Sequence, residues 1–542
     1  MGDLLDRCVL SRIVSRRAEW EPDRVALVFE NRPRDDEVVT FADLAVKGNR
    51  LAHRLKSDGL RPGSRVAIMM RNHPEFIYGY FANSRLAVDT VPVDPRARGD
   101  KLRYFFAFAD SDAVILADYL AVDEDVAQAI ADTGLRAYVV STAEGRADGI
   151  DLSERFTIVN EVLDGAESPT VSEHVTDLAR PWILAYTSGT TGDPKAILFG
   201  YDRLRLYALA PSWFGYGEDD VPYTGLSLIH GNALIVTLMP SLWGRVDHSV
   251  FSRWFTRSRL WDVCRDYGAT SWSNLGGIAT GVYSNPPSDR DRDHRVRTVI
   301  SAGMPRELWR PFEERYGVRV LEWYGTMEGG FAYHPVGFGP VGSFGKPPGD
   351  ILEMDVVDED GRSVPPDGRG ELIARPVGAA AQLAYYKNPE ASAKKIRDGW
   401  LHTGDIASRD ANGWMFFEHR KEEGGLRKMG EFIAESFVSR AVAEYPEVED
   451  VHIYGIPARS GAPGETDIVA AVVVDDPEHF DVDRLLEHCR ARLEPSHVPD
   501  VVQPIIEMPL TATAKVQRRF LMEMLERDRD RVGAGRSGGH DA

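Results

Sequence analysis

The stretch YTSGTTGDPK, residues 186–195, follows directly on the apolar run WILA. It holds two glycines, a proline and a lysine, together with the hydroxyls of Thr187, Ser188, Thr190 and Thr191. Hydroxyl groups, an ammonium group and the backbone N–H groups of a glycine-containing loop can all converge on phosphate oxygens. The stretch therefore predicts a phosphate-binding loop at the end of a buried strand.

This loop is not a Walker P-loop. That motif places about four residues between its first glycine and a Gly-Lys pair, and it has Ser or Thr after the lysine. Here Gly189 and Gly192 are too close together, and Ala196 follows Lys195. Taken alone, the stretch could equally be an ordinary polar turn after a buried strand. The choice between a phosphate-binding loop and such a turn depends on motifs elsewhere in the chain.

Length and charge limit the class of protein. The chain has 542 residues, 43% of them hydrophobic and 27% charged, which is typical of a globular protein with several structural units. Its formal net charge of -20 argues against nucleic-acid binding and against adhesion to anionic membranes. An anionic ligand is still compatible with this charge, because a site can be locally basic.

The sequence predicts a cytoplasmic protein. Its start, MGDLLDRCVLSRIVSRR, lacks the continuous apolar region and the small-residue cleavage site of a signal peptide. No run of about eighteen apolar residues is present, so we expect no transmembrane helix. Cys8, Cys264 and Cys489 are odd in number and far apart, which indicates free thiols rather than a disulfide framework or a metal site.

The N-terminal half predicts an α/β fold. Leu44, Leu51 and Leu55 recur at near-helical spacing, and Gly59 follows as a stop. Helical segments alternate with short apolar runs, which lie at 65–70, 90–95, 136–140, 181–187, 296–303 and 318–325. Such alternation is typical of a parallel sheet that is covered on both faces.

From about residue 350 the pattern changes to short apolar runs separated by turn residues, as in DVVDEDGRSVPPDGRGELIARP. This pattern predicts antiparallel strands with tight turns. The charged segment EHRKEEGG is a candidate boundary, and the region after it has strands and a helix of its own. We therefore expect an N-terminal domain at 1–418, a hinge at 419–425, a C-terminal domain at 426–526 and a disordered tail at 527–542.

Four further motifs give the opening stretch a context. They are SAGMP at 301–305, WYGTMEGG at 323–330, DGWLHTGD at 398–405 and TATAKVQRRFL at 511–521. In this order and at about this spacing, the five motifs resemble those of the adenylate-forming superfamily, which includes acyl-CoA synthetases, adenylation domains of peptide synthetases and luciferases. The resemblance covers residues 10–525. It implies a large domain of stacked αβ subdomains with a β-barrel-like subdomain, followed by a small mobile α+β domain.

The resemblance implies a two-step ligation. A carboxylate first attacks the α-phosphate of ATP, which gives an acyl-adenylate and pyrophosphate, and a nucleophile, usually the thiol of coenzyme A, then displaces AMP. We therefore expect ATP and Mg²⁺ as cofactors, coenzyme A as second substrate and a small-molecule carboxylic acid as partner. A homodimer is compatible with the sequence, and a carrier-protein partner is compatible but not indicated.

Each matched position has a physical reason to be present. The carboxylate of Asp405 can accept hydrogen bonds from both ribose hydroxyls, and Arg420 can donate to the ribose from the other side. Glu328 offers a hard oxygen ligand that suits Mg²⁺, and Tyr324 offers a planar ring for adenine. Lys515 can place a cation between the substrate carboxylate and the α-phosphate, where it stabilises the transition state of the first step.

By the resemblance, the catalytic residues are Lys515, Thr326, Glu328 and His230, with Glu328 as the metal ligand. The nucleotide-binding residues are Thr187, Ser188, Gly189, Thr190, Thr191, Gly192, Lys195, Gly303, Tyr324, Gly325, Asp405 and Arg420. Candidate walls of the acyl pocket are Asn232, Trp272, Gly276, Gly277, Trp323 and Gly329. These walls are mostly small or aromatic and carry no charge, which favours an apolar or aromatic acid over a betaine.

Two segments bear on the branch of the family. SLIHGNAL at 227–234 matches the family's His-bearing segment, in which His230 either gates access between carboxylate and thiol or packs in the pocket wall. The segment NLGGIATGVYSNPPSDRDRDH at 274–294 and the TATAKVQ ending are most similar to crotonobetaine/carnitine–CoA ligases and fatty-acid–CoA ligases.

Two positions depart from the family pattern. Ala514 stands where glycine is common, before the catalytic lysine. His419 stands where an aspartate is usual, and the spacing from Arg420 to Gly430 is one residue longer than in the family. The longer hinge is either a tolerated insertion or a sign of an altered second step. The alternatives to an acyl-CoA ligase are an adenylating enzyme with another acceptor, such as a carrier-protein thiol or a nitrogen nucleophile including nitrite, and a non-catalytic nucleotide-binding protein.

Overall fold

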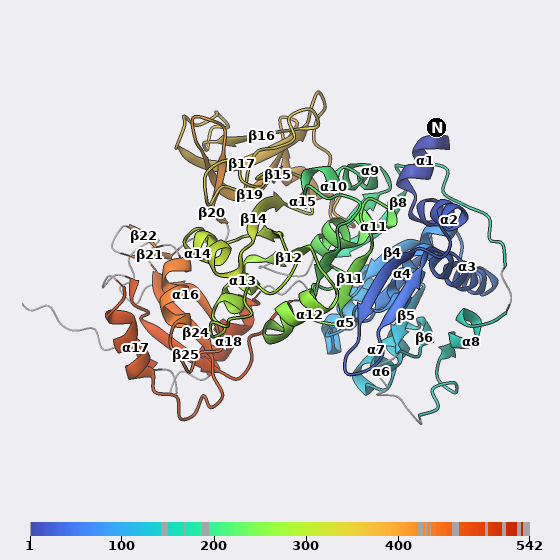
Figure 1. Ribbon diagram of the computed structural model, residues 1–542, viewed down its shortest axis with the longest axis horizontal. Helices are drawn as coiled ribbons and strands as arrows, with labels where there is room; N and C mark the ends of the chain where they lie inside the picture. The colour runs from blue at the N-terminus through green and yellow to red at the C-terminus, as the bar shows by residue number, and fades with distance from the viewer. Residues whose placement is uncertain are drawn as a thin grey trace, which may run out of the picture.

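The computed structural model describes residues 2–142, 150–166, 169–186, 195–420, 426–428, 431–433, 435–457, 466–493, 497–511, 516–527 and 533–534. Two large sheets with their helices form the N-terminal part, a smaller antiparallel sheet follows, and a four-stranded sheet with helices forms the C-terminal part (Figure 1). The predicted α/β fold class is confirmed. The predicted domain boundaries stay predictions, because most of the hinge at 419–425 lies outside the described residues.

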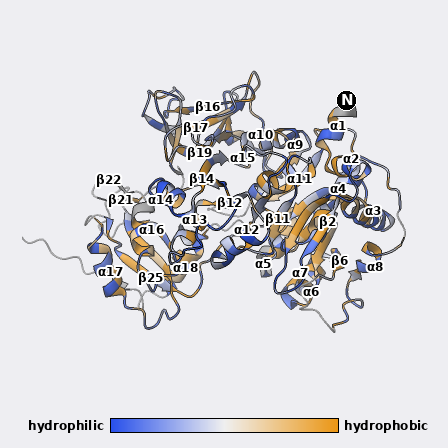
Figure 2. Cartoon of the chain, viewed as in Figure 1, coloured by the Kyte–Doolittle hydropathy of each residue, from blue (hydrophilic) through white to orange (hydrophobic). Residues whose placement is uncertain are grey.

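The first sheet has seven strands in the order β7-β6-β5-β3-β4-β8-β9 and is parallel except for the pair of β8 and β9. Its strands are β3 (Arg65–Met69), β4 (Asp89–Pro92), β5 (Ala113–Ala117), β6 (Arg136–Val140), β7 (Thr157–Ile158), β8 (Pro181–Tyr186) and β9 (Ala196–Gly200). Every residue of β4 and β5 is buried, as expected of parallel strands that are covered on both faces. Apolar residues are correspondingly concentrated on these strands (Figure 2).

The helix predicted from the spacing of Leu44, Leu51 and Leu55 before Gly59 is confirmed as α3 (Phe41–Ser57). The Thr40 hydroxyl accepts a hydrogen bond from the Asp43 N–H group at 3.1 Å, and the Asp43 carboxylate accepts one from the Thr40 N–H group at 2.9 Å. This capping box satisfies backbone donors that the first helical turn leaves without partners. The predicted leucines of α3 are buried against α4 (Pro74–Leu86), so the amphipathic pattern decides which face of the helix is packed.

The second sheet has eight strands in the order β15-β14-β13-β12-β10-β11-β1-β2. Its strands are β1 (Val25–Glu30), β2 (Glu37–Thr40), β10 (Pro222–Thr224), β11 (Ser249–Ser252), β12 (Ser271–Leu275), β13 (Thr298–Ala302), β14 (Arg319–Gly325) and β15 (Phe331–Tyr333). The six strands between β2 and β15 are parallel, so their carboxyl ends lie at one edge. Ligands of α/β proteins bind outside this edge.

The remaining helices of the N-terminal part connect and cover these two sheets. They are α1 (Gly2–Cys8), α2 (Leu10–Trp20), α5 (Gly99–Phe108), α6 (Asp118–Ala121), α7 (Glu124–Thr133), α8 (Asn160–Leu163), α9 (Asp202–Tyr207), α10 (Ala210–Trp213), the π-helix η1 (Ala233–Leu238), α11 (Met239–Leu242), the 3₁₀ turn η2 (Arg257–Arg259), α12 (Leu260–Asp266), α13 (Gly276–Tyr283) and α14 (Arg306–Tyr316). None of the described helices has the length and apolar composition that crossing a membrane requires.

The antiparallel strands predicted after residue 350 are also confirmed. They form a five-stranded sheet of β16 (Leu352–Val357), β17 (Arg369–Pro376), β18 (Ile396–Arg397), β19 (Trp400–Arg409) and β20 (Met415–Arg420). The short helix α15 (Pro389–Lys395) precedes β18, and Asn388 caps it by accepting a hydrogen bond from the Ala391 N–H group at 2.9 Å. This sheet brings β19 and β20 next to the carboxyl end of β14 (Figure 1).

The C-terminal part is a four-stranded sheet with apolar cores on both faces. Its strands are β23 (Asp450–Pro457), β24 (Thr466–Val473), β25 (Val501–Ile505) and β26 (Gly533–Ala534). Its helices are α16 (Glu435–Ala443), α17 (Val482–Arg490) and α18 (Arg518–Arg527), and a separate antiparallel pair joins β21 (Leu426–Lys428) to β22 (Glu431–Ile433). Gly533 and Ala534 differ from the predicted disorder of the tail, because their backbone pairs with β25.

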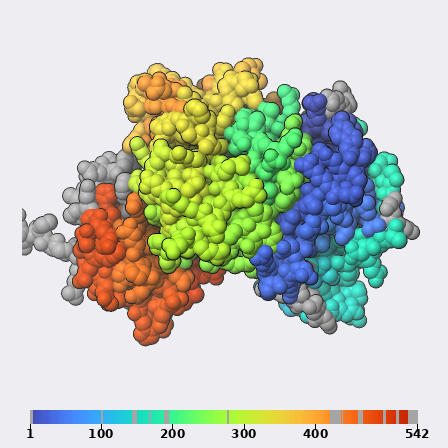
Figure 3. Space-filling view, viewed as in Figure 1, coloured from blue at the N-terminus to red at the C-terminus, as the bar shows by residue number. Residues whose placement is uncertain are grey.

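The C-terminal part lies against the layer that contains the second sheet (Figure 3). Two arginines of the N-terminal part reach backbone carbonyls of the C-terminal part: Arg257 Nη1 donates to the Glu449 oxygen at 3.2 Å, and Arg96 Nη2 donates to the Thr511 oxygen. Thr511 is the first residue of the motif that contains the predicted catalytic lysine. The structure therefore holds the start of this motif at the surface of the N-terminal part.

Gly48 in α3 provides a test of the helix packing. A Cβ atom at this position would lie 2.6 Å from Cγ of the fully buried Phe81 in α4. Although alanine has the higher helix propensity, we expect Gly48→Ala to destabilise the protein by roughly 1–3 kcal/mol, because the two helices must separate. Thermal unfolding would measure the change. Gly349→Ala is the control, because a Cβ atom there meets no atom within 4 Å, and equal midpoints for both variants would contradict the packing argument.

Candidate active site

The sequence motifs meet at the carboxyl edge of the second sheet. The Gly276-Gly277 pair directly follows β12, Gly303 directly follows β13, and the segment with Thr326 and Glu328 directly follows β14. Gly303 has a φ of +100° and Gly329 a φ of +144°, conformations that favour glycine. The chain therefore turns directly after β13 and again four residues after β14, close to the edge of the sheet.

The aromatic motif and the aspartate motif are joined by a hydrogen bond. The Tyr324 hydroxyl donates to Asp405 Oδ2 at 2.5 Å, and the Asp405 N–H group donates to the Thr403 hydroxyl at 3.1 Å. Asp405 is 2% exposed and lies directly opposite Arg420 in the antiparallel pair of β19 and β20. The two residues predicted to bind ribose are thus cross-strand neighbours, beside the tyrosine predicted to stack on adenine.

Glu328 is held at its side chain and at its backbone. The Tyr385 hydroxyl donates to Glu328 Oε1 at 2.8 Å, and Tyr385 is 5% exposed. From α9, Arg203 Nη1 donates to the Met327 oxygen at 2.8 Å and Nη2 donates to the Glu328 oxygen at 3.4 Å. The carboxylate predicted to bind the metal therefore has a defined position.

The turn after β14 is closed by its own threonine. The Thr326 hydroxyl donates to the Gly329 oxygen, and the Gly329 N–H group donates back to the Thr326 hydroxyl oxygen at 3.2 Å. This pair of bonds fixes the direction of Thr326, which is predicted to contact the α-phosphate. Contact with a phosphate oxygen requires the hydroxyl to exchange the Gly329 carbonyl for the ligand as its acceptor.

Lys195, the last residue of the opening stretch, lies near Glu328. Its Nζ atom is 5.3 Å from the centre of the Tyr385 ring, whose hydroxyl holds Glu328. The other predicted residues of the phosphate loop, Thr187, Ser188, Gly189, Thr190, Thr191 and Gly192, lie outside the described residues, as does Lys515. The structure describes the strands on either side of the loop, β8 and β9, which form an antiparallel pair.

Glu322 fixes the backbone of the segment that is predicted to line adenine. Its carboxylate accepts hydrogen bonds from the N–H groups of Gly303 and Met304, the latter at 3.1 Å. Burial raises the pKa of Glu322 to about 8, although these backbone donors and Ser301 favour the charged form. A single buried side chain of β14 thereby fixes the turn after the neighbouring β13.

His230 lies at a junction between the two sheets. Its Nδ1 atom accepts a hydrogen bond from the Asn232 N–H group at 3.0 Å, so the neutral ring carries its proton on Nε2. From the end of β3, the Asn72 side chain donates to the oxygens of Leu226 and Ser252 and accepts from the Leu228 N–H group. Asn72 thus positions the segment that leads to His230.

The predicted pocket walls lie in different surroundings. Asn232 is fully buried, and its side chain donates to the Asn274 oxygen at 3.4 Å, at the end of β12. Trp323 is 8% exposed and packs against Phe214 with 6.1 Å between the ring centres. The prediction for Trp272 is corrected, because its side chain packs in the core beneath α12 and α14, stacked on Phe312 with 6.2 Å between the ring centres.

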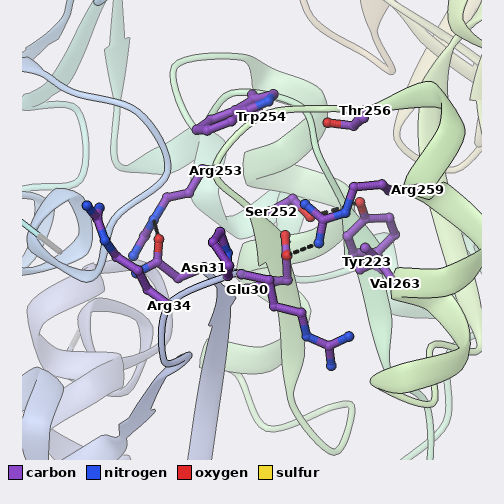
Figure 4. Close-up of a pocket in the computed structure, with 12 residues that line it drawn as sticks. Glu30, Asn31, Arg34, Tyr223, Ser252, Arg253, Trp254, Thr256, Arg259 and Val263 are labelled. Atoms are coloured by element: carbon purple, nitrogen blue, oxygen red, sulfur yellow. Dashed lines mark hydrogen bonds and ion pairs between the residues drawn. The ribbon is translucent and has the colours of Figure 1, made fainter. Parts of the chain in front are cut away.

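A cavity of about 260 Å³ opens at the carboxyl ends of β1, β10 and β11 (Figure 4). Its arginines are paired with neighbouring groups: Arg259 Nη2 donates to Glu30 Oε1 at 2.5 Å, and Arg253 Nε donates to Asn31 Oδ1 at 3.2 Å. None of the sequence-predicted site residues lines this cavity. This cavity is therefore separate from the candidate site.

Four residues of the site were missed by the sequence analysis: Asn72, Arg203, Glu322 and Tyr385. Their functional partners are mostly backbone groups or residues far away in the sequence, which no local motif reports. Tyr385 gave a weak signal, because the pair YY at 385–386 stands one residue before the helix-start signal Asn388-Pro389 in a turn-rich region. Glu322 is part of an apolar strand pattern, where a lone carboxylate indicates a buried interaction.

The buried carboxyl group of Glu322 should make the stability of the folded protein depend on pH. Its pKa is higher in the native state than in the unfolded chain, so its contribution to stability is complete below about pH 4 and is lost as the pH rises towards 8. Glu322→Gln cannot ionise. We expect the stability of the variant relative to the wild type to increase between pH 5 and 8, by at most about 1.4 kcal/mol per pH unit. Thermal unfolding at several pH values measures this difference, and parallel pH profiles for the two proteins would contradict the assignment.

Comparison with known proteins agrees with this geometry. Residues 14–384 match the family model of AMP-binding enzymes, and residues 438–515 match the model of their C-terminal domain. A medium/long-chain-fatty-acid–CoA ligase of Mycobacterium marinum is 29% identical over 493 residues, which cover 90% of this chain and 92% of the relative. A crotonobetaine/carnitine–CoA ligase of Salmonella heidelberg is 24% identical over 516 residues, which cover 92% of this chain and 96% of the relative.

The fold is also found in solved structures. An anthranilate CoA ligase in complex with anthranoyl-AMP matches with a TM-score of 0.78 and 20% identity, over 96% of this chain and 98% of that chain. The resemblance predicted from the five motifs is thus confirmed: the chain belongs to the AMP-binding enzyme family, within the acyl-CoA synthetase branch of the adenylate-forming superfamily.

Proposed function

We propose that the protein activates a carboxylic acid with ATP and transfers the acyl group to coenzyme A. The observation that carries this proposal is the hydrogen bond between Tyr324 and Asp405, since it joins two of the family's nucleotide motifs across two sheets. The relatives named as CoA ligases, which this chain matches over most of its length, support coenzyme A as the acceptor.

In this proposal the nucleotide lies at the carboxyl edge of the second sheet. The segment around Gly303 and the Tyr324 ring hold adenine. Asp405 has one oxygen in the hydrogen bond from Tyr324, and its carboxylate retains acceptor capacity for the ribose hydroxyls. Arg420, which lies opposite Asp405 in the sheet, binds the ribose as well.

Glu328 is the proposed metal ligand, and its surroundings fit Mg²⁺. Among the described residues, no group of three or more His, Cys, Asp or Glu side chains could hold a metal. Mg²⁺ does not need such a group, because it commonly takes one or two carboxylates and completes its shell with phosphates and water. When bound, Mg²⁺ offsets the negative charge of the departing pyrophosphate. Lys195 and the phosphate loop hold the β- and γ-phosphates.

Lys515 is the proposed catalytic cation of the first step. It reaches the acid and the α-phosphate only when the C-terminal part closes, and the hinge around 419–425 allows that part to turn away for the second step. His230, whose Nδ1 atom accepts a hydrogen bond from the Asn232 N–H group, lies in the segment proposed to separate the acid from the thiol. Glycines 276, 277 and 329 with Trp323 and Asn232 form the proposed acyl pocket, whose uncharged walls suit an apolar or aromatic acid.

The three cysteines are buried, and free thiols fit a reducing compartment. A cytoplasmic location is therefore part of the proposal.

The longer hinge remains the one feature that favours another acceptor.

The substrate test is mass spectrometry of complete reactions. Purified protein is mixed with Mg-ATP and a panel of aliphatic, aryl and arylpropenoic acids, with and without coenzyme A. We expect AMP with every accepted acid and acyl-CoA only when coenzyme A is present. Acyl-adenylate and AMP without any thioester would replace coenzyme A by another acceptor, and nitrite with an aryl amine would then be tested. Bound nucleotide without AMP would leave only a non-catalytic role.

Because Lys515 is proposed to act in the first half-reaction and not in the second, Lys515→Ala should affect the two steps differently. We expect acyl-adenylate formation to fall by roughly 100-fold or more, because a preorganised charge at the reacting phosphate is lost. Thioester formation from supplied acyl-adenylate should change little, since Lys515 is withdrawn in that step. Single-turnover measurements of the two half-reactions provide the test. An equal loss in both would contradict the proposed roles.

A further inference from the structure

Tyr385 occupies the space between the two charged groups that are proposed to meet the phosphates. Its hydroxyl donates to Glu328 Oε1 at 2.8 Å, and Lys195 Nζ lies 5.3 Å from the centre of its ring. The same side chain therefore contacts a carboxylate through its polar end and an ammonium group through its aromatic face. Neither Lys195 nor Glu328 lies near Tyr385 in the sequence, so the fold alone creates this arrangement.

The backbone of Tyr385 is tied to the strand that follows Lys195. Tyr385 forms an antiparallel bridge with Ile197 in β9, and the Tyr386 N–H group donates to the Ala196 oxygen at 2.7 Å. The Tyr385 N–H group donates to the Ser392 hydroxyl at 2.9 Å, and the ring packs in the large core of the first sheet. Because backbone and ring are both fixed, the hydroxyl has a defined position relative to Lys195.

The partner carboxylate is fixed as well. Arg203 binds the carbonyl oxygens of Met327 and Glu328, and its guanidinium carbon lies 4.3 Å from the centre of the Phe199 ring in β9. Strand β9 thus supports both sides of the arrangement: it follows Lys195 directly, and it carries the ring on which Arg203 rests. The hydrogen bond from Tyr385 uses Oε1 of Glu328, and the carboxylate has a second oxygen, Oε2, that can bind a metal.

Resting on the function proposed above, we propose that Tyr385 is a positioning residue of the first half-reaction, which holds Glu328 at the distance from Lys195 that Mg-ATP requires. Removing one hydrogen bond to a charged group typically weakens the state that depends on it by about 10-fold to 100-fold. The loss should appear in the use of Mg²⁺ and ATP, and not in the step that consumes the acyl-adenylate.

Tyr385→Phe tests this role, because it removes the hydroxyl and keeps the ring. We expect the Mg²⁺ concentration for half-maximal adenylation to rise by about 10-fold, with thioester formation from supplied acyl-adenylate within about 2-fold of the wild type. Tyr386→Phe is the matched control: it removes the neighbouring hydroxyl, which donates to Asp110 Oδ2 at 2.5 Å, and should leave both steps unchanged. An unchanged Mg²⁺ dependence in Tyr385→Phe, or an equal loss of both half-reactions, would overturn the proposal.

A double-mutant cycle separates positioning from a general structural role. If Tyr385 acts through the Glu328 carboxylate, Tyr385→Phe should have little further effect in the Glu328→Gln background. Fully additive losses would overturn the proposal.

Mg²⁺-dependent binding of a non-hydrolysable ATP analogue to the full chain, followed by calorimetry, provides a readout that does not need a known acid. Tyr385→Phe should require more Mg²⁺ than the wild type to bind the analogue. If the wild type binds the analogue but forms no product from ATP and any acid, the proposed function is contradicted. The binding comparison still tests the role of Tyr385 in that case.

Discussion

The hydrogen bond from the Tyr324 hydroxyl to Asp405 connects two sheets through residues that are 81 positions apart. Asp405 is almost completely buried, and a buried carboxylate is costly unless hydrogen-bond donors surround it. Tyr324 supplies one of these donors from the end of β14. The antiparallel pair of β19 and β20 places Arg420 opposite the same aspartate. The five-stranded sheet is thereby held against the carboxyl edge of the eight-stranded sheet, and the candidate nucleotide site lies where the two sheets meet.

A second set of contacts fixes the proposed metal ligand relative to the phosphate loop. Strand β9 begins directly after Lys195, pairs with Tyr385 and carries the Phe199 ring beneath Arg203. Tyr385 and Arg203 in turn hold the side chain and the backbone of Glu328. Since phosphoryl transfer depends mainly on the positioning of charges, such rigid support has a direct chemical consequence.

The sequence predicted those parts of the fold that depend on local patterns. The periodic leucines predicted α3, and the apolar runs predicted the buried parallel strands. The motif residues Tyr324 and Asp405, which the sequence assigned to one nucleotide site, are in contact in the structure. Tyr385 and Glu322 were not found, because their importance depends on contacts with backbone groups and on chain segments that only the folded structure brings together.

Trp272 illustrates a different limit. Successive residues of a strand point to opposite faces of the sheet, and the pattern of β12 does not reveal which face is covered by helices. In the structure, Trp272 points to the face that α12 and α14 cover, so a residue expected in a pocket belongs to the core. The phosphate loop and Lys515 lie outside the described residues, and their roles stay predictions drawn from the family motifs.

The proposed adenylation is tested most directly by acid-dependent exchange of labelled pyrophosphate into ATP in the absence of coenzyme A. Exchange requires that the enzyme form an acyl-adenylate reversibly at a site that binds ATP, Mg²⁺ and the acid together. We expect exchange that depends on both the acid and Mg²⁺ and that is strongly reduced in Asp405→Ala. Tight binding of Mg-ATP without exchange for any acid of the panel would contradict the proposed adenylation.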